Sequence, residues 1–492
     1  MAISTIKTLD PASRIVNSEK RAAKRALTLF HDAARRVPAY KDFLHKNGVD
    51  PQHIRTIADF AHVPLTDKPS YMTQYSLDEL SWDGALSYAK CVSTSSGSTG
   101  VPSFWPRGQT HDVAINLMLQ RLYEEVFNTR TGSTLCVNSF ALGPWIAGFE
   151  FYNGVKWTAE RGSNMTMLTP GIDKAEAVKE ILKLSGLFDR VIIGGYPPFL
   201  KDIIEEGRSA GIDWSTIDLR LLAGGEAVSD YWKDRILEMI GRPGEFRRIM
   251  LEYGMAEAGV LANETPVSAV VRRSLGALSK HDAYFPRPEE VVGLYQYYPG
   301  VRYFEGTKDG TLAMTSDAGL PLIKYETRDA GGTLTHDDVL EHGGQILRDA
   351  AAQHEIDLES WSLPFVYLRG RKDFSVSLYA LNIYVENIKR ALESSSIAVH
   401  LSGLFTMSVT QTPDLDQRFE LVVELARDEV PTVELVRTLT LDAVQTLKRV
   451  NAEYAKLHES IGERAVPIIT LVRSGDIQTI PGRKHKWFKR ES

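Results

Sequence analysis

The chain of 492 residues has little of several features that would place it in a particular class. It holds only two cysteines, Cys91 and Cys136, which excludes a disulfide framework and a cysteine-rich zinc site and favours buried free thiols in a reducing compartment. No apolar run reaches about 18 residues, so we expect no transmembrane helix and no membrane partner. The first residues, Met-Ala-Ile-Ser-Thr-Ile-Lys, are too polar and too short an apolar stretch for a secretory signal, which favours a cytoplasmic location.

An excess of basic residues is also lacking. The 57 Lys and Arg residues face 63 Asp and Glu residues, and the resulting net charge of −6 does not favour a nucleic-acid partner. The histidines show no metal-ligand spacing. The chain is longer than the ~250–300 residues at which single cores stop growing, so we expect more than one domain.

The most informative segment that is present is the loop at residues 94–102, which reads Thr-Ser-Ser-Gly-Ser-Thr-Gly-Val-Pro. Glycines let backbone N–H groups approach a ligand, and hydroxyl groups add donors, so the loop suits a polyphosphate. The predicted phosphate-binding residues are Ser95, Ser96, Gly97, Ser98, Thr99 and Gly100. The spacing is not that of a Walker loop, and a Ser/Gly-rich surface linker is the alternative interpretation.

Five further motifs follow in order along the chain. They read Gly-Gly-Glu-Ala at 224–227, Tyr-Gly-Met-Ala-Glu at 253–257, Leu-Pro-Leu-Ile-Lys-Tyr-Glu-Thr-Arg-Asp at 320–329, Gly-Arg-Lys-Asp at 370–373 and Pro-Gly-Arg-Lys at 481–484. Together with the loop, they resemble the motifs of the adenylate-forming superfamily, which includes acyl-CoA synthetases, luciferase-like enzymes and nonribosomal adenylation domains. The openings at 37–40, 48–51 and 63–68 resemble its phenylacetate-CoA ligase-like branch.

Hydrophobic patterning and this resemblance together predict an α/β fold. An amphipathic helix is expected at 18–37, and short apolar runs predict buried strands at 135–137, 191–193, 219–222 and 248–251. Later, the pattern predicts strands at 405–409, 419–425 and 468–472 and a helix at 432–460. We therefore expect a large N-terminal multi-sheet α/β domain of the adenylate-forming type at residues 1–371 and a small mobile α+β C-terminal domain at 372–492.

The resemblance implies an ATP- and Mg²⁺-dependent ligase that turns a small carboxylic acid into an acyl-adenylate and then transfers the acyl group, with CoA expected as the acceptor. It implies that Lys484 bridges the carboxylate and the α-phosphate and that Glu257 is a catalytic residue and the metal ligand. The alternative interpretation is that Lys484 lies in a solvent-exposed basic tail and has no catalytic role. Arg483 is a competing candidate for the same catalytic role. For Glu257, the alternative is an ordinary strand-to-helix turn.

The resemblance also assigns the nucleotide-binding residues. These are Gly224, Gly225 and Glu226 in the adenine loop, Tyr253 and Gly254 beside the adenine, and Asp329 and Arg371 at the ribose. A carboxylate suits a vicinal diol because it accepts two hydrogen bonds. The segment after Arg371 is expected to form the hinge at Asp373, about which the small domain rotates.

The acyl pocket is marked only by aromatic residues. Trp145, Phe149 and Tyr196 lie where the branch has its acid, and ordinary core packing explains them equally well.

Several positions depart from the pattern of the superfamily, namely Val101, Ala256, Arg328, Phe374 and Ala380. They keep two alternatives open: transfer of the acyl group to an amine or a carrier-protein thiol, and a non-catalytic protein that binds a nucleotide or an acyl-adenylate. The oligomeric state stays open as well, with a homodimer as one alternative.

Overall fold

The structure is a computed structural model that describes residues 19–95, 103–371, 375–426 and 429–477. The chain divides into two compact units, each described by itself below. Unit 1 comprises the described residues of Met1–Thr94, Phe104–Gly195 and Ile203–Lys372, and unit 2 comprises those of Ser95–Ser103, Tyr196–Asp202 and Asp373–Ser492.

The larger unit alternates helices and strands. Its helices are α2 (Glu19–Arg36), α3 (Pro38–Lys46), α4 (Ile57–Phe60), α5 (Gln109–Arg121), α6 (Ile146–Ala159), α7 (Lys174–Leu184), α8 (Pro197–Ser209, shared with unit 2), α9 (Asp230–Met239), α10 (Pro266–His281) and α11 (His336–Gln353). Its strands are β1 (Ala89–Ser95), β2 (Ser103–Gly108), β3 (Ser133–Ser139), β4 (Asn164–Leu168), β5 (Arg190–Gly195), β6 (Leu219–Gly224), β7 (Ile249–Met255), β8 (Gly259–Asn263), β9 (Gly293–Gln296), β10 (Tyr303–Gly306), β11 (Thr311–Ala318), β12 (Leu320–Leu334) and β13 (Phe365–Arg371).

One sheet of 11 strands, in the order β10-β11-β12-β13-β9-β8-β7-β6-β5-β3-β4, dominates unit 1, and β1 and β2 form a separate two-stranded sheet. The strands β4, β3, β5, β6 and β7 are parallel, so their carboxyl ends meet at one edge. The four predicted buried strands are β3, β5, β6 and β7, and these predictions are confirmed. The α/β class is confirmed with them.

The other half of the sheet is antiparallel, which the sequence patterning did not predict. The strand β12 is its long member, with 15 residues, and pairs with β11 on one side and β13 on the other. Its register places Asp329 opposite Arg371 across the β12–β13 pair. Two residues that lie 42 positions apart (371 minus 329) thereby become neighbours.

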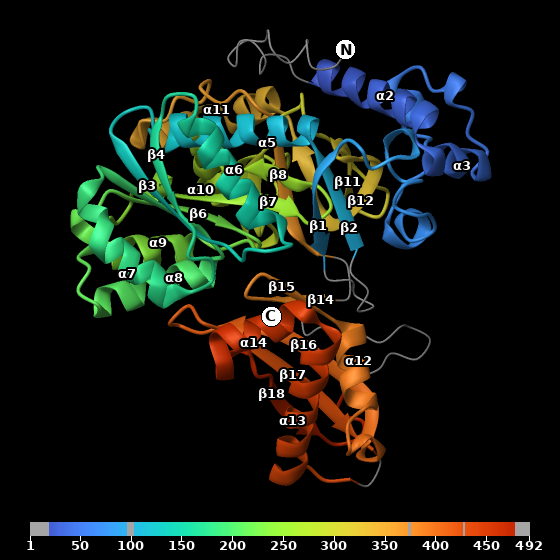
Figure 1. Ribbon diagram of the computed structural model, residues 1–492, viewed down its shortest axis with the longest axis vertical. Helices are drawn as coiled ribbons and strands as arrows, with labels where there is room; N and C mark the ends of the chain where they lie inside the picture. The colour runs from blue at the N-terminus through green and yellow to red at the C-terminus, as the bar shows by residue number, and fades with distance from the viewer. Residues whose placement is uncertain (1–18, 96–102, 372–374, 427–428, 478–492) are drawn as a thin grey trace. The chain divides into compact units, whose positions relative to one another are not determined.

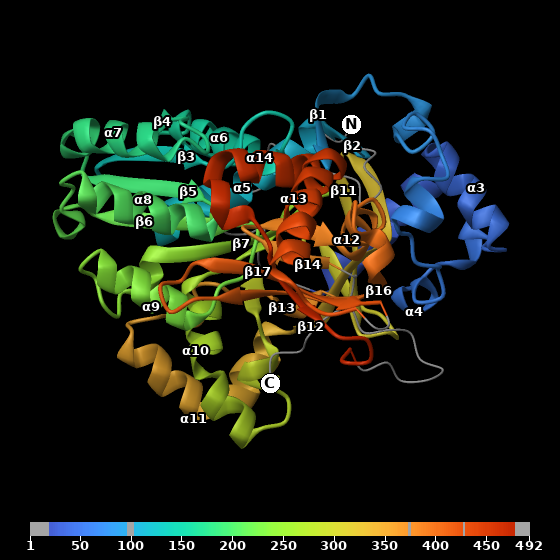
Figure 2. The same cartoon turned by 90° about the horizontal axis from the view of Figure 1, so that it is seen from below.

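Helices cover both faces of the large sheet (Figure 1). On one face, α6 packs against β3, β4 and β8 and against α5. On the opposite face, α10 packs against β9 and α11 packs against α10, as the view in Figure 2 shows. Because both faces are covered, the strands in the middle are apolar on both sides.

The N-terminal segment adds a small apolar core beside β12. The helix predicted at 18–37 is α2, and Pro38 both ends it and occupies the first position of α3. The aromatic rings of Phe30, Tyr40 and Phe60 lie in this core against Ile323 of β12. Further along, Thr66 bonds β12 through its backbone, with its N–H donating to the Lys324 carbonyl at 3.1 Å.

Unit 2 is a small α+β structure. Its elements are β14 (Ser375–Leu378), β15 (Leu381–Tyr384), α12 (Val385–Glu393), β16 (Leu401–Gln411), β17 (Gln417–Leu425), α13 (Val433–Val450), α14 (Ala452–Ile461) and β18 (Ile468–Val472). The strands β16, β17 and β18 form a three-stranded sheet, and β14 pairs with β15. The helices α12 and α13 pack against each other and against this sheet.

The single helix predicted at 432–460 is wrong in one respect, because the structure has two helices there. Asn451 lies between them with an extended backbone (φ −135°, ψ 100°), and its side-chain oxygen caps α14 by accepting from the Tyr454 N–H at 3.0 Å. Asparagine favours such caps because its side chain competes for backbone donors. The predicted strands at 405–409, 419–425 and 468–472 are confirmed as β16, β17 and β18.

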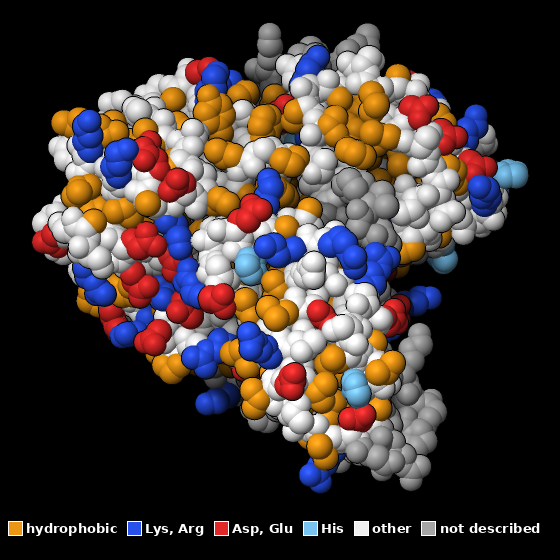
Figure 3. Space-filling model, turned by 60° about the horizontal axis from the view of Figure 1, so that its bottom comes forward, with side chains coloured by type: hydrophobic (Ala, Val, Ile, Leu, Met, Phe, Trp, Pro, Cys, Tyr) orange, Lys and Arg blue, Asp and Glu red, His pale blue; other side chains and the backbone are white. Residues whose placement is uncertain are grey.

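The surface carries mixed charge. On the face shown in Figure 3, Lys and Arg side chains are interspersed with Asp and Glu side chains. Among the helices of the described residues, none has the length and apolar character that a membrane crossing requires.

A buried ion pair fixes α9 to the end of β8 and yields a first prediction. Lys233 Nζ lies 2.5 Å from Glu264 Oε2, with side chains 2% and 0% exposed. Replacing Lys233 by Met leaves the buried carboxylate with the Leu251 N–H, at 3.0 Å, and with Arg272 as its remaining cation, at 3.4 Å. We therefore expect the free energy of unfolding in urea to fall by about 3 kcal/mol.

The matched control lies on the same helix. Arg235 is 2.5 Å from Glu238, but both side chains are about half exposed, at 47% and 52%. Arg235→Met should cost less than about 1 kcal/mol. Equal losses for the two variants would contradict the assignment of the stability to burial of the charge.

Candidate functional site

The predicted adenine loop lies at the carboxyl edge of the parallel strands. Gly224 ends β6 and is the register partner of Glu252 on β7. Gly225 follows with a φ of 92°, a left-handed conformation that favours glycine, and it turns the chain away from the sheet. Glu226 comes next and is half-buried. This edge is where open α/β sheets place their ligands.

Tyr253 and Asp329 come together although 76 residues separate them. The Tyr253 hydroxyl donates a hydrogen bond to Asp329 Oδ2 at 2.5 Å, and both residues are buried, at 6% and 8% exposure. The ring of Tyr253 also stacks on Tyr295, with centroids 5.7 Å apart. A charge-assisted hydrogen bond therefore joins the motif at 253–257 to the motif at 320–329.

Glu257 lies in the turn between β7 and β8, where it meets a residue from the N-terminal segment. The Lys68 ammonium lies 2.6 Å from Glu257 Oε1, and the glutamate side chain is only 10% exposed. The same ammonium lies 5.5 Å from the centroid of the Trp105 ring. The carboxylate predicted to hold a metal thus has a cation beside it.

A buried arginine fixes the backbone of this turn. Arg107 of β2 is fully buried, and its Nη1 donates to the Glu257 carbonyl at 2.8 Å and to the Ala318 carbonyl at 2.7 Å. Its Nη2 donates to the Ala256 carbonyl. Burial lowers the pKa of Arg107, as expected for a cation removed from water, and carbonyl oxygens replace the lost hydration.

The segment that carries Lys68 is anchored to β12 on both sides. Thr66 Oγ1 donates to the Ile323 carbonyl at 2.8 Å, and the Glu326 N–H donates to the Thr66 carbonyl at 2.8 Å. Asp67 accepts from Arg328 at 3.4 Å. Arg328 has a φ of 64°, so an arginine holds the left-handed conformation that glycine usually provides at such a position.

The remaining predicted residues of the nucleotide site fall partly outside the described residues. Ser95 is the last residue of β1 and is buried, whereas Ser96, Gly97, Ser98, Thr99 and Gly100 lie outside the described part of the chain. Asp373 and Lys484 lie outside it as well. Arg371 ends β13 opposite Asp329, and Gly254 follows Tyr253 on β7.

The predicted acyl-pocket residues lie at the start of α6 and directly after β5. Trp145 is half-buried and caps α6, and Phe149 on that helix is 37% exposed. Tyr196 follows β5, and its ring lies 6.1 Å from Phe199. The aromatic side chain of α6 that reaches the sheet is Phe151, which occupies the space where a Cβ on Gly194 would lie.

Two glutamates on the α6 face of the sheet have different surroundings. Glu150 of α6 is satisfied: His111 Nε2 lies 3.0 Å from Oε1, and the Val260 N–H donates to Oε2 at 2.9 Å. Burial lowers the pKa of His111 to about 4, so that ring is neutral at pH 7. Glu252 of β7 has no such partners, and Oε1 is buried without a hydrogen-bond partner among the described residues. Burial, with a smaller effect of the nearby Glu150, raises the pKa of Glu252 to about 8.

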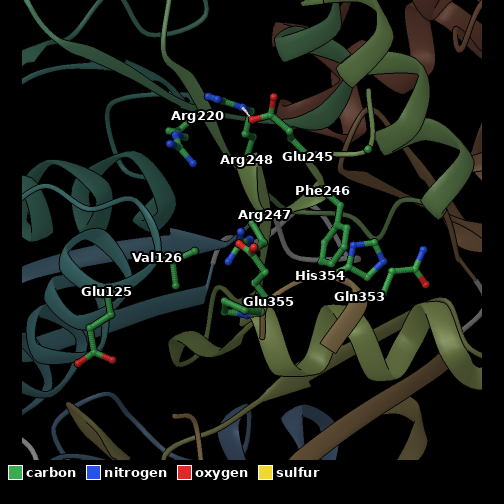
Figure 4. Close-up of a pocket in the computed structure, with 12 residues that line it drawn as sticks. Glu125, Val126, Arg220, Glu245, Phe246, Arg247, Arg248, Gln353, His354 and Glu355 are labelled. Atoms are coloured by element: carbon green, nitrogen blue, oxygen red, sulfur yellow. Dashed lines mark hydrogen bonds and ion pairs between the residues drawn. The ribbon is translucent and has the colours of Figure 1, made fainter. Parts of the chain in front are cut away.

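A cavity of about 410 Å³ opens at the amino ends of the parallel strands, opposite the edge that carries the predicted adenine loop (Figure 4). It lies where β6 and β7 begin, and two of the arginines that line it are paired: Arg220 with Asp218 at 3.0 Å, and Arg248 with Glu245 at 2.5 Å. Because the carboxyl ends of the strands lie at the other end of the sheet, we do not assign this cavity to the site.

The sequence analysis missed Lys68, Arg107 and Glu252. Lys68 stood in the N-terminal pattern at 63–68 without a role. Arg107 and Glu252 are charged residues inside strongly apolar runs, Phe-Trp-Pro-Arg and Ile-Met-Leu-Glu-Tyr, and that contrast was a signal that could have identified them.

The described residues fit a magnesium ion through one carboxylate. They contain no cluster of three or more His, Cys, Asp or Glu side chains able to hold a metal. A single carboxylate is still sufficient for Mg²⁺ when nucleotide phosphates and water complete its shell, and Glu257 can provide it.

Comparison with known proteins adds the fold. No protein-family profile and no curated protein matches the chain. Among solved structures, it is similar to 2-hydroxyisobutyryl-CoA ligase with 2-HIB-AMP and CoA in the thioesterification state, at a TM-score of 0.65 and 18% identity over 99% of this chain and 94% of that one. An open conformation of that ligase matches at a TM-score of 0.53 and 18% identity, over 98% and 93% of the two chains. Its postadenylation state matches at 0.55 and 16%, over 99% and 94%.

These likenesses show that the chain has the fold of this CoA ligase. The fold that the resemblance to the adenylate-forming superfamily implied is thereby confirmed. The phenylacetate-CoA ligase-like branch and the roles of individual residues remain predictions.

The raised pKa of Glu252 predicts how stability depends on pH. The folded protein holds this proton up to about pH 8, whereas the unfolded chain releases it near the ordinary value of 4.5. The unfolded state therefore binds fewer protons between these values, and the contribution of Glu252 to stability falls as pH rises, by at most ~1.4 kcal/mol per pH unit.

Glu252→Gln removes this titration. We expect the free energy of unfolding of the variant, minus that of the unsubstituted protein, to grow steadily from pH 5 to pH 8 in urea titrations. All other groups titrate in both proteins and cancel, and Glu341→Gln at an exposed position controls for the change of side chain. Parallel pH curves would show that Glu252 is not held protonated.

Proposed function

We propose that this protein is an ATP-dependent carboxylic acid ligase, which forms an acyl-adenylate and pyrophosphate and then an acyl-CoA thioester. One observation carries the proposal: Gly224, Tyr253, Glu257 and Asp329, from three separate segments, lie at one edge of a sheet. That edge is where this fold class binds nucleotides. The fold shared with 2-hydroxyisobutyryl-CoA ligase, whose structures hold 2-HIB-AMP and CoA, supports the same conclusion.

In the first proposed step, a carboxylate oxygen of the acid attacks the α-phosphorus of ATP, and the bond from that phosphorus to the bridging oxygen breaks to release pyrophosphate. Two anions must approach each other, so the site needs positive charge placed in advance. In our proposal Lys484 supplies it at the carboxylate and the α-phosphate. The loop at residues 95–100 would donate hydrogen bonds to the outer phosphates.

The nucleoside would bind beside Tyr253. Its ring offers an aromatic face, Gly224 to Glu226 border the adenine, and Asp329 accepts hydrogen bonds from the ribose hydroxyls, with Arg371 opposite it. In the structure Tyr253 already orients the Asp329 carboxylate. Glu257 would hold Mg²⁺, which supplies positive charge to the phosphates when it is bound.

In the second proposed step, the CoA sulfur attacks the acyl carbon, and AMP leaves with the oxygen that joined it to the acyl group. We propose that rotation about Asp373, between domains at 1–371 and 372–492, separates the two steps. The division of the chain after Lys372 supports this boundary. The proposal of the phenylacetate-CoA ligase-like branch rests on the sequence patterns at 37–40, 48–51 and 63–68.

The direct test is acid-dependent release of pyrophosphate across a panel of carboxylic acids, followed by the mass of the product with CoA, an amine or a carrier protein as acceptor. Lys484→Ala should lower the rate of pyrophosphate release at least ~100-fold and leave ATP binding nearly unchanged. Lys489→Ala, in the same basic segment, is the control and should keep its rate. If Lys484→Ala loses binding and turnover equally, the lysine merely holds ATP.

Lys68 provides a second test of the phosphate site. The chain has Val101 at a position where the superfamily often has a lysine. We propose that the Lys68 ammonium, 2.6 Å from Glu257, adds the positive charge that such a lysine would provide. Lys68→Met should raise the KM for ATP about tenfold, or ~1.4 kcal/mol, without changing the KM for the acid. Lys41→Met, at an exposed position, is the control. An unchanged or lower KM for ATP would mean that Lys68 only competes for Glu257.

A further inference from the structure

Glu252 is an acidic residue with a buried carboxyl oxygen, and the proposed reaction leaves it unused. It lies on β7 immediately before Tyr253, in a strand that is otherwise apolar up to that point. Its partner Glu150 on the same face is fully hydrogen-bonded, whereas Glu252 Oε1 has no hydrogen-bond partner among the described residues. Leaving such an atom unpaired costs folding free energy, so its retention needs an explanation.

Glu252 lies beside buried aromatic rings that form a wall on the α6 side of the sheet. A Cβ placed on Gly224 would lie 3.5 Å from the Phe140 ring and 3.7 Å from Glu252 Oε2, which are ordinary contact distances, so the glycine leaves room for a methyl group between them. The rings of Phe140, Phe151 and Tyr123 continue the wall, with centroids 5.9 Å and 6.2 Å apart. Part of Glu252 remains accessible even though Oε1 is buried.

The position of this wall indicates that it would contact the acid substrate rather than the nucleotide. Successive residues of a strand point to opposite faces of the sheet, so Glu252 and Tyr253 serve different faces. Tyr253 faces Asp329 and the proposed ribose. Glu252 faces the α6 side, where Phe140 precedes Trp145 and Phe149, two of the residues predicted to border the acyl group. A second buried atom without a partner among the described residues, the Tyr123 hydroxyl, lies in the same wall.

On these grounds, and resting on the proposed ligase function, we infer that Glu252 is a specificity-determining residue and that the acid substrate carries a hydrogen-bond donor, a hydroxyl or an amine, which pairs with it. Aromatic rings would enclose the apolar part of the acid, and the donor would satisfy Oε1. A carboxyl that keeps its proton at pH 7 pairs with a hydroxyl without ionising, whereas an ammonium would favour the ionised carboxylate, whose proton would pass to water.

The test compares kcat/KM for pyrophosphate release with matched acids: an unsubstituted acid, its hydroxy counterpart and its amino counterpart, over several chain lengths and an aromatic series. The unsubstituted site should favour one of the substituted acids about 100-fold, because a site built to pair with a donor rejects the analogue that lacks it. Glu252→Leu should reverse this preference. Glu252→Gln should keep activity on a hydroxy acid and lose it on an amino acid, which separates the two donors.

The controls separate the outcomes. Met250→Leu, two residues earlier on the same strand face, should keep the wild-type preference, and thermal melts should confirm that all variants fold. A preference that Glu252→Leu leaves unchanged would overturn this inference and leave the ligase proposal standing. Failure of the unsubstituted protein to release pyrophosphate with any acid would overturn both.

Discussion

The candidate site depends on the fully buried guanidinium group of Arg107. Arg107 binds the carbonyl groups of two turns, one between β7 and β8 and one between β11 and β12, which lie far apart in the sequence. Arg302 adds a second clamp, with Nη2 donating to the Ala258 carbonyl at 2.9 Å and to the Val260 carbonyl at 3.1 Å. The two guanidinium groups lose their water on burial. The backbone carbonyls accept hydrogen bonds in place of that water, so each group provides the hydrogen bonds that the other needs.

This clamp explains why Glu257 can face a cation without disrupting the fold. The position of the turn is set by its backbone, through Arg107, and does not depend on what its side chain binds. The carboxylate is therefore available to exchange partners, from the Lys68 ammonium to the charged groups of a nucleotide complex. Rigid backbone and exchangeable side-chain partners together are the arrangement that a preorganised site requires.

The sequence predicted those parts of the molecule in which local pattern and structure agree. Short apolar runs located β3, β5, β6 and β7, because strands buried on both faces must be continuously apolar. The break at Asn451 escaped prediction, since the apolar stripe continues through α13 and α14 while only the capping geometry divides them. The antiparallel strands also escaped, because their pairing is set by contacts between distant segments.

The sequence predicted which residues belong to the candidate site but not how they contact one another. The motifs named Tyr253 and Asp329, but nothing in one chain's sequence indicates that one donates a hydrogen bond to the other. Lys68 was missed for a related reason, since its pairing with Glu257 is set by a contact between distant segments. Glu252 differs, because a charge within an apolar run was a signal that the sequence did offer. Glycine positions were less restrictive than their motif suggests: Arg328 and Ala380 both hold positive φ, at 64° and 66°, without being glycine.

The anchoring of Thr66 to β12 has a consequence for the leading part of the chain. The backbone N–H and the carbonyl of Thr66 both bond to β12, the strand that carries Asp329. A chain that started after residue 68 would retain every strand of the large sheet but would lack these bonds and the Lys68 ammonium beside Glu257. The N-terminal segment therefore completes the surroundings of Glu257, although its described residues contribute no strand to the large sheet.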